Sequence, residues 1–301
     1  MKTTRFLNLD CVELTNNTLS ILVTQSAGPR VISLRFRGGK NLFAELPHFT
    51  IESPGGTFHF YGGHRLWRAP EDLSLTYLPD DAPIEITKIE HGLRVVQPIE
   101  PVTGLQKSFD ITLEASAVTI HHTLTNHSQT PIFCAPWAIT QFKPGGVAIL
   151  PQSTHTTGLL PNRRIILWPY TDIRSPYITW GNQYIFVQAK MREGALKIGF
   201  PNPRGWLAYW QAGTLFVKKA VFDPQAQYLD HGSSSESYCN DEFLELETLG
   251  GAVSLSEGAS VSHQETWELY GDVEKPADEA AMESLVKQYG LEVVGEMFEA
   301  N

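Results

Sequence analysis

The sequence predicts an all-β fold of mainly antiparallel strands, with one short helix near the C-terminus. Segments rich in β-branched and aromatic residues recur along most of the 301 residues, and Gly, Pro, Asn or Asp separate them. This pattern is typical of a β-sandwich or β-barrel. No repeat, low-complexity tract or Pro/Ser-rich linker divides the chain, so we expect a single domain over residues 1–301.

The strand predictions rest on short segments that are rich in β-branched and aromatic residues and bounded by Gly, Pro, Asn or Asp. The clearest of them are residues 19–25, 30–36, 118–126, 184–189, 207–211 and 214–222. In the segment 118–126, alternation places Val118, Ile120, His122 and Leu124 on one face and His121 on the other. The two neighbouring histidines therefore cannot bind one metal ion together.

The segment 276–290 has the pattern of an amphipathic helix packed on the outside of the sheets. Pro276 precedes an acidic first turn, and Gly290 supplies a stop signal. Apolar residues recur between them at the spacing of one helical face: Met282, Leu285, Val286 and Tyr289.

Composition excludes several classes of partner. The formal net charge of -10 argues against a surface for nucleic acid or anionic lipid, which would need clustered Lys and Arg. No apolar run is long enough to span a bilayer, and the first 25 residues contain no continuous apolar segment. Cys11, Cys134 and Cys239 are widely spaced and form no C-x-x-C pair. We expect a cytoplasmic protein with a small, neutral or weakly charged ligand and no membrane partner.

Signatures of the common cofactor and nucleophile sites are missing. The chain lacks a P-loop, a dinucleotide-binding glycine motif, an H-E-x-x-H helix and a G-x-S-x-G elbow, so we expect no cofactor. His59 and His64 share one segment, but no clear third ligand accompanies them, and we expect no metal site.

Two segments hold the candidate functional residues. FLELETLGG, residues 243–251, reads as a buried strand that carries Glu245 and Glu247 on one side. Burying a carboxylate is costly unless a partner or a function compensates for it. YGGHRLWRAPED, residues 61–72, reads as a glycine-led loop that carries His64, Arg65 and Trp67. Together, these residue types suit a site that binds a sugar.

Several segments in order resemble the galactose mutarotase-like (aldose 1-epimerase) superfamily, and more narrowly an uncharacterised branch of it. The resemblance rests on GPRVISLRFRGGKNLF (28–43), GGHRLWRAPE (62–71), LTNHSQTPIFCAPWAITQF (124–142), GWLAYWQAGTLFVKK (205–219) and FLELETLGGAVSLSEGASVSHQETWELY (243–270). It covers about residues 20–270, and the order of the motifs is more specific than any one of them. The resemblance implies an antiparallel β-supersandwich with one open sugar cleft.

The resemblance also implies roles for individual residues. In the enzymes of this superfamily, a carboxylate and an acid, usually His, open the sugar ring and interconvert the α and β anomers. Glu247 matches the base by position, and Arg65 matches a sugar-contacting arginine. The family's second histidine is absent from CAPWAITQF (134–142), so His64 is the best substitute for the acid. Weaker candidates for the acid are Lys218 or Lys219, His155 and His231.

Further residues are expected to contact the sugar. Trp67 and Trp137 neighbour the family's site segments, and an indole face can stack on a sugar ring. Asp230 and Glu236 precede the strand of Glu247, and Lys219 could hold an acidic group. Glu245 shares the face of Glu247 and could be the functional carboxylate instead.

Three functions remain open from the sequence. The first is an aldose mutarotase-like enzyme, and the second is a non-catalytic carbohydrate-binding protein on the same fold. The third is an isomerase or lyase that acts on an acidic sugar held by Arg65 and Lys219. The partner in each case is a monosaccharide or a derivative of one, and an exposed strand edge could form a homodimer. Fold analogy alone does not choose among them.

Overall fold

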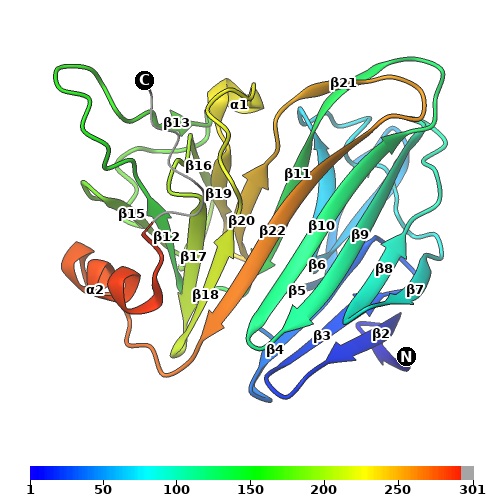
Figure 1. The fold of residues 1–301 in the computed structure, drawn as a ribbon, viewed down its shortest axis with the longest axis horizontal. Coiled ribbons are helices and arrows are strands. Elements are labelled where there is room, and N and C mark those ends of the chain that lie inside the picture. The colour runs from blue at the N-terminus through cyan, green and yellow to red at the C-terminus, as the bar shows by residue number, and fades with distance from the viewer. Residues whose placement is uncertain (293–301) are drawn as a thin grey trace.

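Two large antiparallel sheets face each other in the computed structural model, which describes residues 1–292 (Figure 1). The 12-stranded sheet has the order β1-β2-β3-β4-β6-β11-β20-β19-β16-β13, and β5 and β21 pair with β6 and β11. Its strands are β1 Lys2–Phe6, β2 Leu9–Thr15, β3 Leu19–Thr24, β4 Arg30–Phe36, β5 Glu45–Ser53, β6 Gly56–Ala69, β11 Ile132–Phe142, β13 Ile166–Leu167, β16 Leu196–Phe200, β19 Ser235–Cys239, β20 Leu244–Leu249 and β21 Val253–Leu255.

The second sheet has ten strands in the order β14-β15-β12-β17-β18-β22-β10-β9-β8-β7. Its strands are β7 Glu85–Ile89, β8 Gly92–Val96, β9 Leu105–Glu114, β10 Ala117–Asn126, β12 Val147–Pro151, β14 Ile178–Trp180, β15 Tyr184–Gln188, β17 Trp206–Gln211, β18 Thr214–Lys219 and β22 Ser260–Tyr270. On β10 the residues predicted to face inward, Val118 to Leu124 in steps of two, are fully buried, whereas His121 is exposed. The predicted all-β sandwich is confirmed.

The main core lies between the inner faces of the two sheets. Its centre is a group of aromatic rings in edge-to-face contact, in which Phe43 lies 5.7 Å from Phe142 and 5.6 Å from Trp267. Such pairs add about 0.5–1.5 kcal/mol each beyond the burial of their area. This packing holds the apolar faces of the two sheets at a fixed distance. It thereby sets the positions of the strands that carry the polar site residues.

Strand β6 is the element that differs most from expectation. The sequence suggests a loop at Gly62 and Gly63, but β6 runs without interruption from Gly56 to Ala69. The glycines serve a close approach of backbones, because a Cβ at Gly62 would lie 2.0 Å from the carbonyl oxygen of Ala44. Both also have positive φ, which glycine adopts at little cost. The bend lets β6 pair with β5 in its first half and with β4 and β11 in its second half.

Helix α2, Glu279–Tyr289, confirms the predicted C-terminal helix with a start three residues later than Pro276. Asp278 caps it by accepting a hydrogen bond from the backbone N–H of Ala281 at 2.8 Å. Met282 and Val286 pack on apolar side chains of β12, β15 and β17, on the outer face of the ten-stranded sheet. The other helix, α1 Leu229–Gly232, is a single turn with left-handed φ angles inside it. No helix within residues 1–292 is long and apolar enough to cross a membrane.

Candidate functional site

A pocket of about 300 Å³ lies on the outer face of the 12-stranded sheet, turned away from the second sheet. Strands β5, β6, β11, β16, β19 and β20 supply most of its walls, and we call it the outer-face pocket. Its lining comprises Phe49, Ile51, Phe60, Arg65, Trp67, Glu71, Tyr77, Trp137, Tyr170, Ala195, Lys197, Tyr238, Phe243 and Glu245. Aromatic walls with a few convergent polar groups are typical of small-molecule sites, which start at about this volume.

One polar group of the pocket is the pair of Arg65 and Glu245. Arg65 Nη2 donates to Glu245 Oε1 at 3.0 Å, and Gln141 Nε2 donates to the same oxygen at 2.9 Å. The guanidinium lies 4.1 Å from the ring centroid of Trp67 and is only 2 % exposed. Its Nε and Nη1 have no hydrogen-bond partner within residues 1–292. Both nitrogens are themselves buried, between the rings of Phe60 and Trp67, so they are unpaired donors at the wall of the pocket.

The carboxyl group of Glu245 is suited to exchange a proton near neutral pH. Burial raises the pKa of Glu245 to about 7, although the charge of Arg65 opposes this shift. A group with a pKa close to the working pH can both accept and donate a proton in one catalytic cycle. Among the acidic side chains of this strand, Glu245 is the one that lines the pocket.

Lys197 on β16 is the second cation of the pocket. Its Nζ lies 2.7 Å from Glu236 Oε2 and donates to Glu247 Oε2 at 2.9 Å. Burial opposes its charge, but the two carboxylates outweigh burial and raise the pKa of Lys197 well above its usual value. The ammonium also lies 4.7 Å from the ring centroids of both Trp137 and Trp168. It is thus a fixed positive charge between aromatic faces.

Glu247 lies behind this lysine. The carboxylate is fully buried, and its Oε2 accepts hydrogen bonds from Lys197 and, at 2.7 Å, from Trp137 Nε1. Glu236 is its cross-strand neighbour on β19, and burial together with the charge of Glu247 raises the pKa of Glu236 well above its usual value. Glu247 does not line the pocket and would reach a ligand through Lys197 and Trp137.

His64 faces the opposite side of β6 from Arg65 and Trp67. Its ring lies in the space between the two sheets, is fully buried and does not line the outer-face pocket. Its Nε2 is 2.7 Å from His122 Nε2, and its Nδ1 is 2.9 Å from Thr140 Oγ1. The period of two in a strand explains this placement, because neighbouring residues point to opposite faces.

The partners of His64 belong to a polar network inside the main core. Lys218 Nζ lies 2.8 Å from Glu265 Oε1 and donates to Thr140 Oγ1 at 3.1 Å. It also donates to the backbone carbonyl oxygens of Ala138 and Leu246, each at 3.0 Å. Trp267 Nε1 donates to Glu265 Oε2 at 3.0 Å. Every charge in this network therefore has a close partner, as a buried charge requires.

His64, His122 and Glu265 also lie close enough to share a metal ion, with ligand atoms within 4.8 Å of one another. Their hydrogen bonds, however, are complete without one. His122 Nδ1 donates to the carbonyl oxygen of His263 at 2.9 Å, so its Nε2 accepts from His64 Nε2. His64 Nδ1 then accepts from the hydroxyl of Thr140. This assignment of tautomers satisfies both rings.

The remaining predicted residues are scattered. Lys219 pairs with Glu268 at 2.7 Å on the ten-stranded sheet and lies away from the outer-face pocket. Asp230 in α1 is not a lining residue, but Lys197 and Glu247 both influence its pKa, which burial raises. His155 and His231 are exposed. The structure thus brings together Arg65, Trp67, Trp137, Glu236 and Glu247 around Lys197 and Glu245.

Lys197 is the main site residue that the sequence reasoning missed. It occupies the second position of LKIGF, a five-residue strand in which it is the one charged residue. A charge between apolar neighbours is the same signal that singled out Glu245 and Glu247. Glu71 and Tyr77, which are hydrogen-bonded to each other, reach the pocket from the loop after β6, where no pattern points to them.

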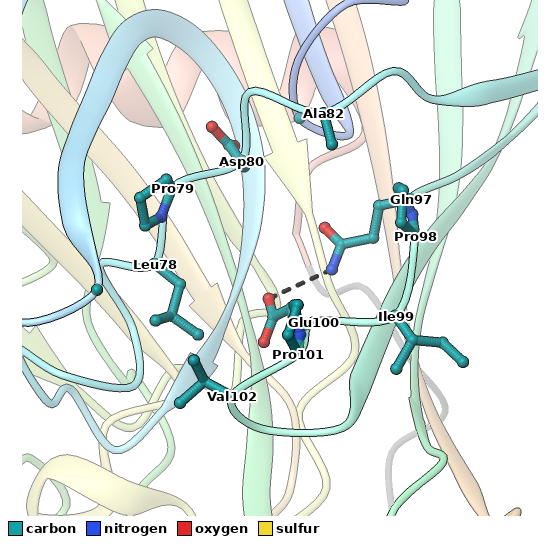
Figure 2. A pocket seen from close by; sticks show the side chains of 12 residues that line it. Leu78, Pro79, Asp80, Ala82, Gln97, Pro98, Ile99, Glu100, Pro101 and Val102 are labelled. Carbon is teal, nitrogen blue, oxygen red and sulfur yellow. Dashed lines mark hydrogen bonds between the residues drawn. The ribbon is translucent and has the colours of Figure 1, made fainter.

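A second cavity, of about 250 Å³, lies between the loops 78–82 and 97–102. Figure 2 shows Leu78, Pro79, Ile99 and Pro101 around it, with the amide of Gln97 directed at Glu100. Its two acids are already paired, Asp80 with Arg30 at 2.8 Å and Glu100 with Lys107 at 2.5 Å. This cavity therefore offers fewer polar groups to a sugar than the outer-face pocket.

Comparison with known proteins identifies the fold. No protein-family model and no curated protein sequence matches the chain. Among solved structures, a galactose mutarotase-like protein from Lactobacillus casei matches with a TM-score of 0.56 and 10% identity, over 86% of this chain and 100% of that chain. A provisionally named aldose 1-epimerase from Escherichia coli K12 matches with a TM-score of 0.53 and 12% identity, over 87% and 99%.

A provisionally named mutarotase from Salmonella typhimurium matches with a TM-score of 0.56 and 12% identity, over 89% of this chain and 93% of that chain. Each of the three likenesses covers at least 86% of this chain. The chain therefore has the β-supersandwich fold of galactose mutarotase-like proteins.

Proposed function

We propose that the outer-face pocket binds a monosaccharide and that the protein interconverts its anomers. The observation that carries this proposal is the position of Glu245, a pocket-lining carboxyl group with a pKa of about 7, beside two unpartnered N–H groups of Arg65. The names of the structural neighbours, which include mutarotases and an aldose 1-epimerase, support a sugar-related function. Indole and phenyl faces in the walls suit the C–H surface of a sugar ring.

The reaction needs one group to accept a proton and one to supply it. Glu245 would take the proton of the anomeric hydroxyl as the bond from C1 to the ring oxygen breaks. Glu245 would then deliver this proton to the ring oxygen, and reversal of both transfers after rotation at C1 would form the other anomer. The N–H groups of Arg65 and Lys197 would stabilise the negative charge that develops on the oxygens.

Glu247, the base implied by the family resemblance, has a different place in this proposal. Its hydrogen bonds to Lys197 and Trp137 suit a residue that positions them. Glu245 is the alternative base that the alternation of the strand left open, and its exposure to the pocket favours it. His64, turned toward the main core, is replaced as hydrogen-bond donor by Lys197 and Arg65.

Replacement of Glu245 by Gln tests this assignment. We expect anomer exchange to slow by roughly 10²–10⁴-fold, because the amide cannot transfer the proton but keeps the shape of the side chain. Sugar affinity should change little, since Gln retains an acceptor oxygen for Arg65 and Gln141. Proton NMR exchange spectroscopy on neutral aldoses, uronates and sugar phosphates would measure both the rate and the substrate class.

The matched control is Glu247→Gln, two residues along the same strand and on the same face. If Glu247 is the base, this variant should lose exchange while Glu245→Gln keeps it. An unchanged rate in Glu245→Gln would exclude Glu245 as the proton-transfer group. A parent protein that accelerates no exchange for any sugar in the panel would contradict the enzymatic proposal as a whole.

The aromatic wall can be tested separately through Trp67. The indole lies over Arg65 and contacts Trp137, with ring centroids 5.4 Å apart. We expect Trp67→Ala to weaken sugar binding by roughly tenfold or more, because it removes a stacking surface and loosens Arg65. Isothermal titration calorimetry would measure the affinity. The control is Trp180→Ala, which removes an indole that does not line the pocket. Equal affinities of the Trp67→Ala variant and the parent would place the sugar elsewhere.

A non-catalytic sugar-binding protein is the second candidate function. It is favoured by one observation, that the outer-face pocket has no histidine among its lining residues, all of which the structure describes. In that case Trp67→Ala would weaken binding, and Glu245→Gln would have no exchange to remove. An enzyme for acidic sugars receives support from the unpartnered N–H groups of Arg65 but not from Lys219, which lies on the other sheet.

A further inference from the structure

A groove of about 800 Å³ lies along β18 and β22 of the ten-stranded sheet, bounded by the segments 220–228 and 250–253. It shares no lining residue with the outer-face pocket and exceeds that pocket more than twofold in volume. The pairing of β18 with β22 ends at Lys219 and Thr266, so the groove is lined by both faces of β22, with Ser262 and Gln264 on the outward face and His263 on the inward face. The groove therefore stands apart from the proposed sugar pocket, and its use does not depend on that proposal.

His263 connects the groove with the buried polar network. The ring is only 8 % exposed, yet it is one of the groove-lining residues. Its Nε2 lies 2.7 Å from Thr248 Oγ1, and the hydroxyl of Thr248 donates to Glu265 Oε1. A hydroxyl has one proton, so Nε2 must be the donor toward Thr248. Nδ1 of the neutral ring is then a bare acceptor.

The acceptor at Nδ1 has no hydrogen-bond partner within residues 1–292 and lies at the wall of the groove. A Cβ at Gly250 would be 3.5 Å from Nδ1, so the missing side chain leaves access to this nitrogen from the groove. Burial lowers the pKa of His263 to about 4, which keeps the ring neutral and the nitrogen unprotonated at pH 7. The site thus requires a ligand group that donates a hydrogen bond.

The charges around the groove favour a neutral ligand. Lys219 is the one cationic lining residue, all of the lining being described, and Glu268 neutralises it at 2.7 Å. Asp223 accepts a hydrogen bond from the backbone N–H of Gln225 at 2.8 Å. The other polar groups are amides and hydroxyls, which both donate and accept hydrogen bonds. An anion would find no unpaired cation here.

We propose that this groove binds a neutral oligosaccharide, one hydroxyl group of which donates a hydrogen bond to Nδ1 of His263. A hydroxyl is a donor that carries no charge, which suits the acceptor nitrogen and a groove whose one lysine is already neutralised. Amides and hydroxyls along β22 offer further hydrogen bonds at the spacing of alternate strand residues. The larger volume suits a ligand of more than one sugar residue.

The test follows the ring nitrogens of His263 by long-range ¹H–¹⁵N NMR in the full-length protein. Maltotriose and cellotriose serve as probes, with D-glucose as the monosaccharide control. We expect a saturable shift of the Nδ1 resonance with at least one trisaccharide, because that nitrogen gains a hydrogen bond. Gln264→Trp, which fills the groove at an exposed strand position, should raise the Kd at least tenfold.

Thr87→Trp is the matched control for Gln264→Trp. Thr87 is an exposed residue on β7, four strands away from β22, so the same substitution there leaves the groove open. The Thr87→Trp variant should bind the trisaccharide with the same Kd as the parent protein. No shift at His263 with either trisaccharide, or equal binding by Gln264→Trp and the parent, would overturn the proposal. The indole Nε1 of Trp137 reports on the outer-face pocket, so the two sites can fail independently.

Discussion

Replacement of Glu265 by Leu should lower the free energy of unfolding by about 3–5 kcal/mol, because it leaves a buried charge without its partner. Lys218 and Glu265 are both fully buried, with Nζ and Oε1 2.8 Å apart. The ammonium would keep its bonds to Ala138 O, Leu246 O and Thr140 but lose its counter-charge. Trp267 Nε1 and the hydroxyl of Thr248 would also lose their acceptor. Equilibrium unfolding in urea would measure the change.

The control for this experiment is an ion pair at the surface of the same sheet. Asp110 binds Arg94 on the neighbouring strand, and both side chains are substantially exposed. Asp110→Leu should therefore cost no more than about 1 kcal/mol. The double variant Lys218→Met/Glu265→Leu should recover much of the loss, since it removes both charges together. A Glu265→Leu variant as stable as Asp110→Leu would show that the buried pair contributes little.

Acid should destabilise the protein through its buried neutral histidines. Burial lowers the pKa of His122 to about 3 and that of His263 to about 4, whereas an unfolded chain titrates near the ordinary value of 6.5. Below pH 6.5 the unfolded state therefore binds more protons than the folded state. The stability that each neutral histidine contributes is complete above pH 6.5. It falls by about 1.4 kcal/mol per pH unit until the pH reaches the folded pKa, about 4 for His263 and about 3 for His122.

The raised pKa of Glu245, about 7, acts in the opposite direction between about pH 4.5 and 7, and the raised pKa of Glu236 acts in the same direction as that of Glu245, so a variant must isolate the histidines. His122→Gln keeps an acceptor for His64 but removes one titrating ring. We expect the free energy of unfolding of this variant to fall less steeply than that of the parent between pH 6.5 and 4. Urea unfolding at a series of pH values would measure both slopes. Identical slopes would mean that His122 does not titrate differently in the two states.

The fold class could be predicted because local patterns and tertiary packing agree in most of the strands. The alternation in residues 118–126 predicts which side chains are buried, and the inward-facing positions are buried in β10. The helix over residues 276–290 is recognisable from its spacing and stop signal, and it forms as α2. In these elements one face meets the core and the other does not, so the sequence period carries the information.

The segment at residues 61–72 could not be read correctly because glycine has more than one structural use. Gly62 and Gly63 suggest a loop, but they lie inside a continuous strand, where a Cβ would come within 2.0 Å and 2.2 Å, respectively, of a backbone carbonyl oxygen. Once this segment is a strand, His64 and Arg65 must face opposite sides. His64, the expected acid, and Arg65, the expected sugar contact, therefore lie in two environments, one in the main core and one in the outer-face pocket.

The position of Lys197 depends on strand order, which no local pattern reveals. β16 joins the 12-stranded sheet beside β19, and β19 in turn pairs with β20. This long-range pairing brings Lys197 to Glu236 and Glu247. Apolar neighbours mark Glu247 and Lys197 as buried charges, but Glu236 lies among serines, and nothing in the sequence shows that the three neutralise one another.

The docking of α2 has a consequence for how the chain folds during synthesis. The strands β12, β15 and β17 leave the ribosome long before residues 279–289. Their apolar outer face therefore stays uncovered until α2 has been synthesised. Until then Val147, Phe186 and Trp206 present an apolar surface to other nascent chains and to chaperones. Docking of α2 therefore covers an aggregation-prone surface that the earlier part of the chain exposes.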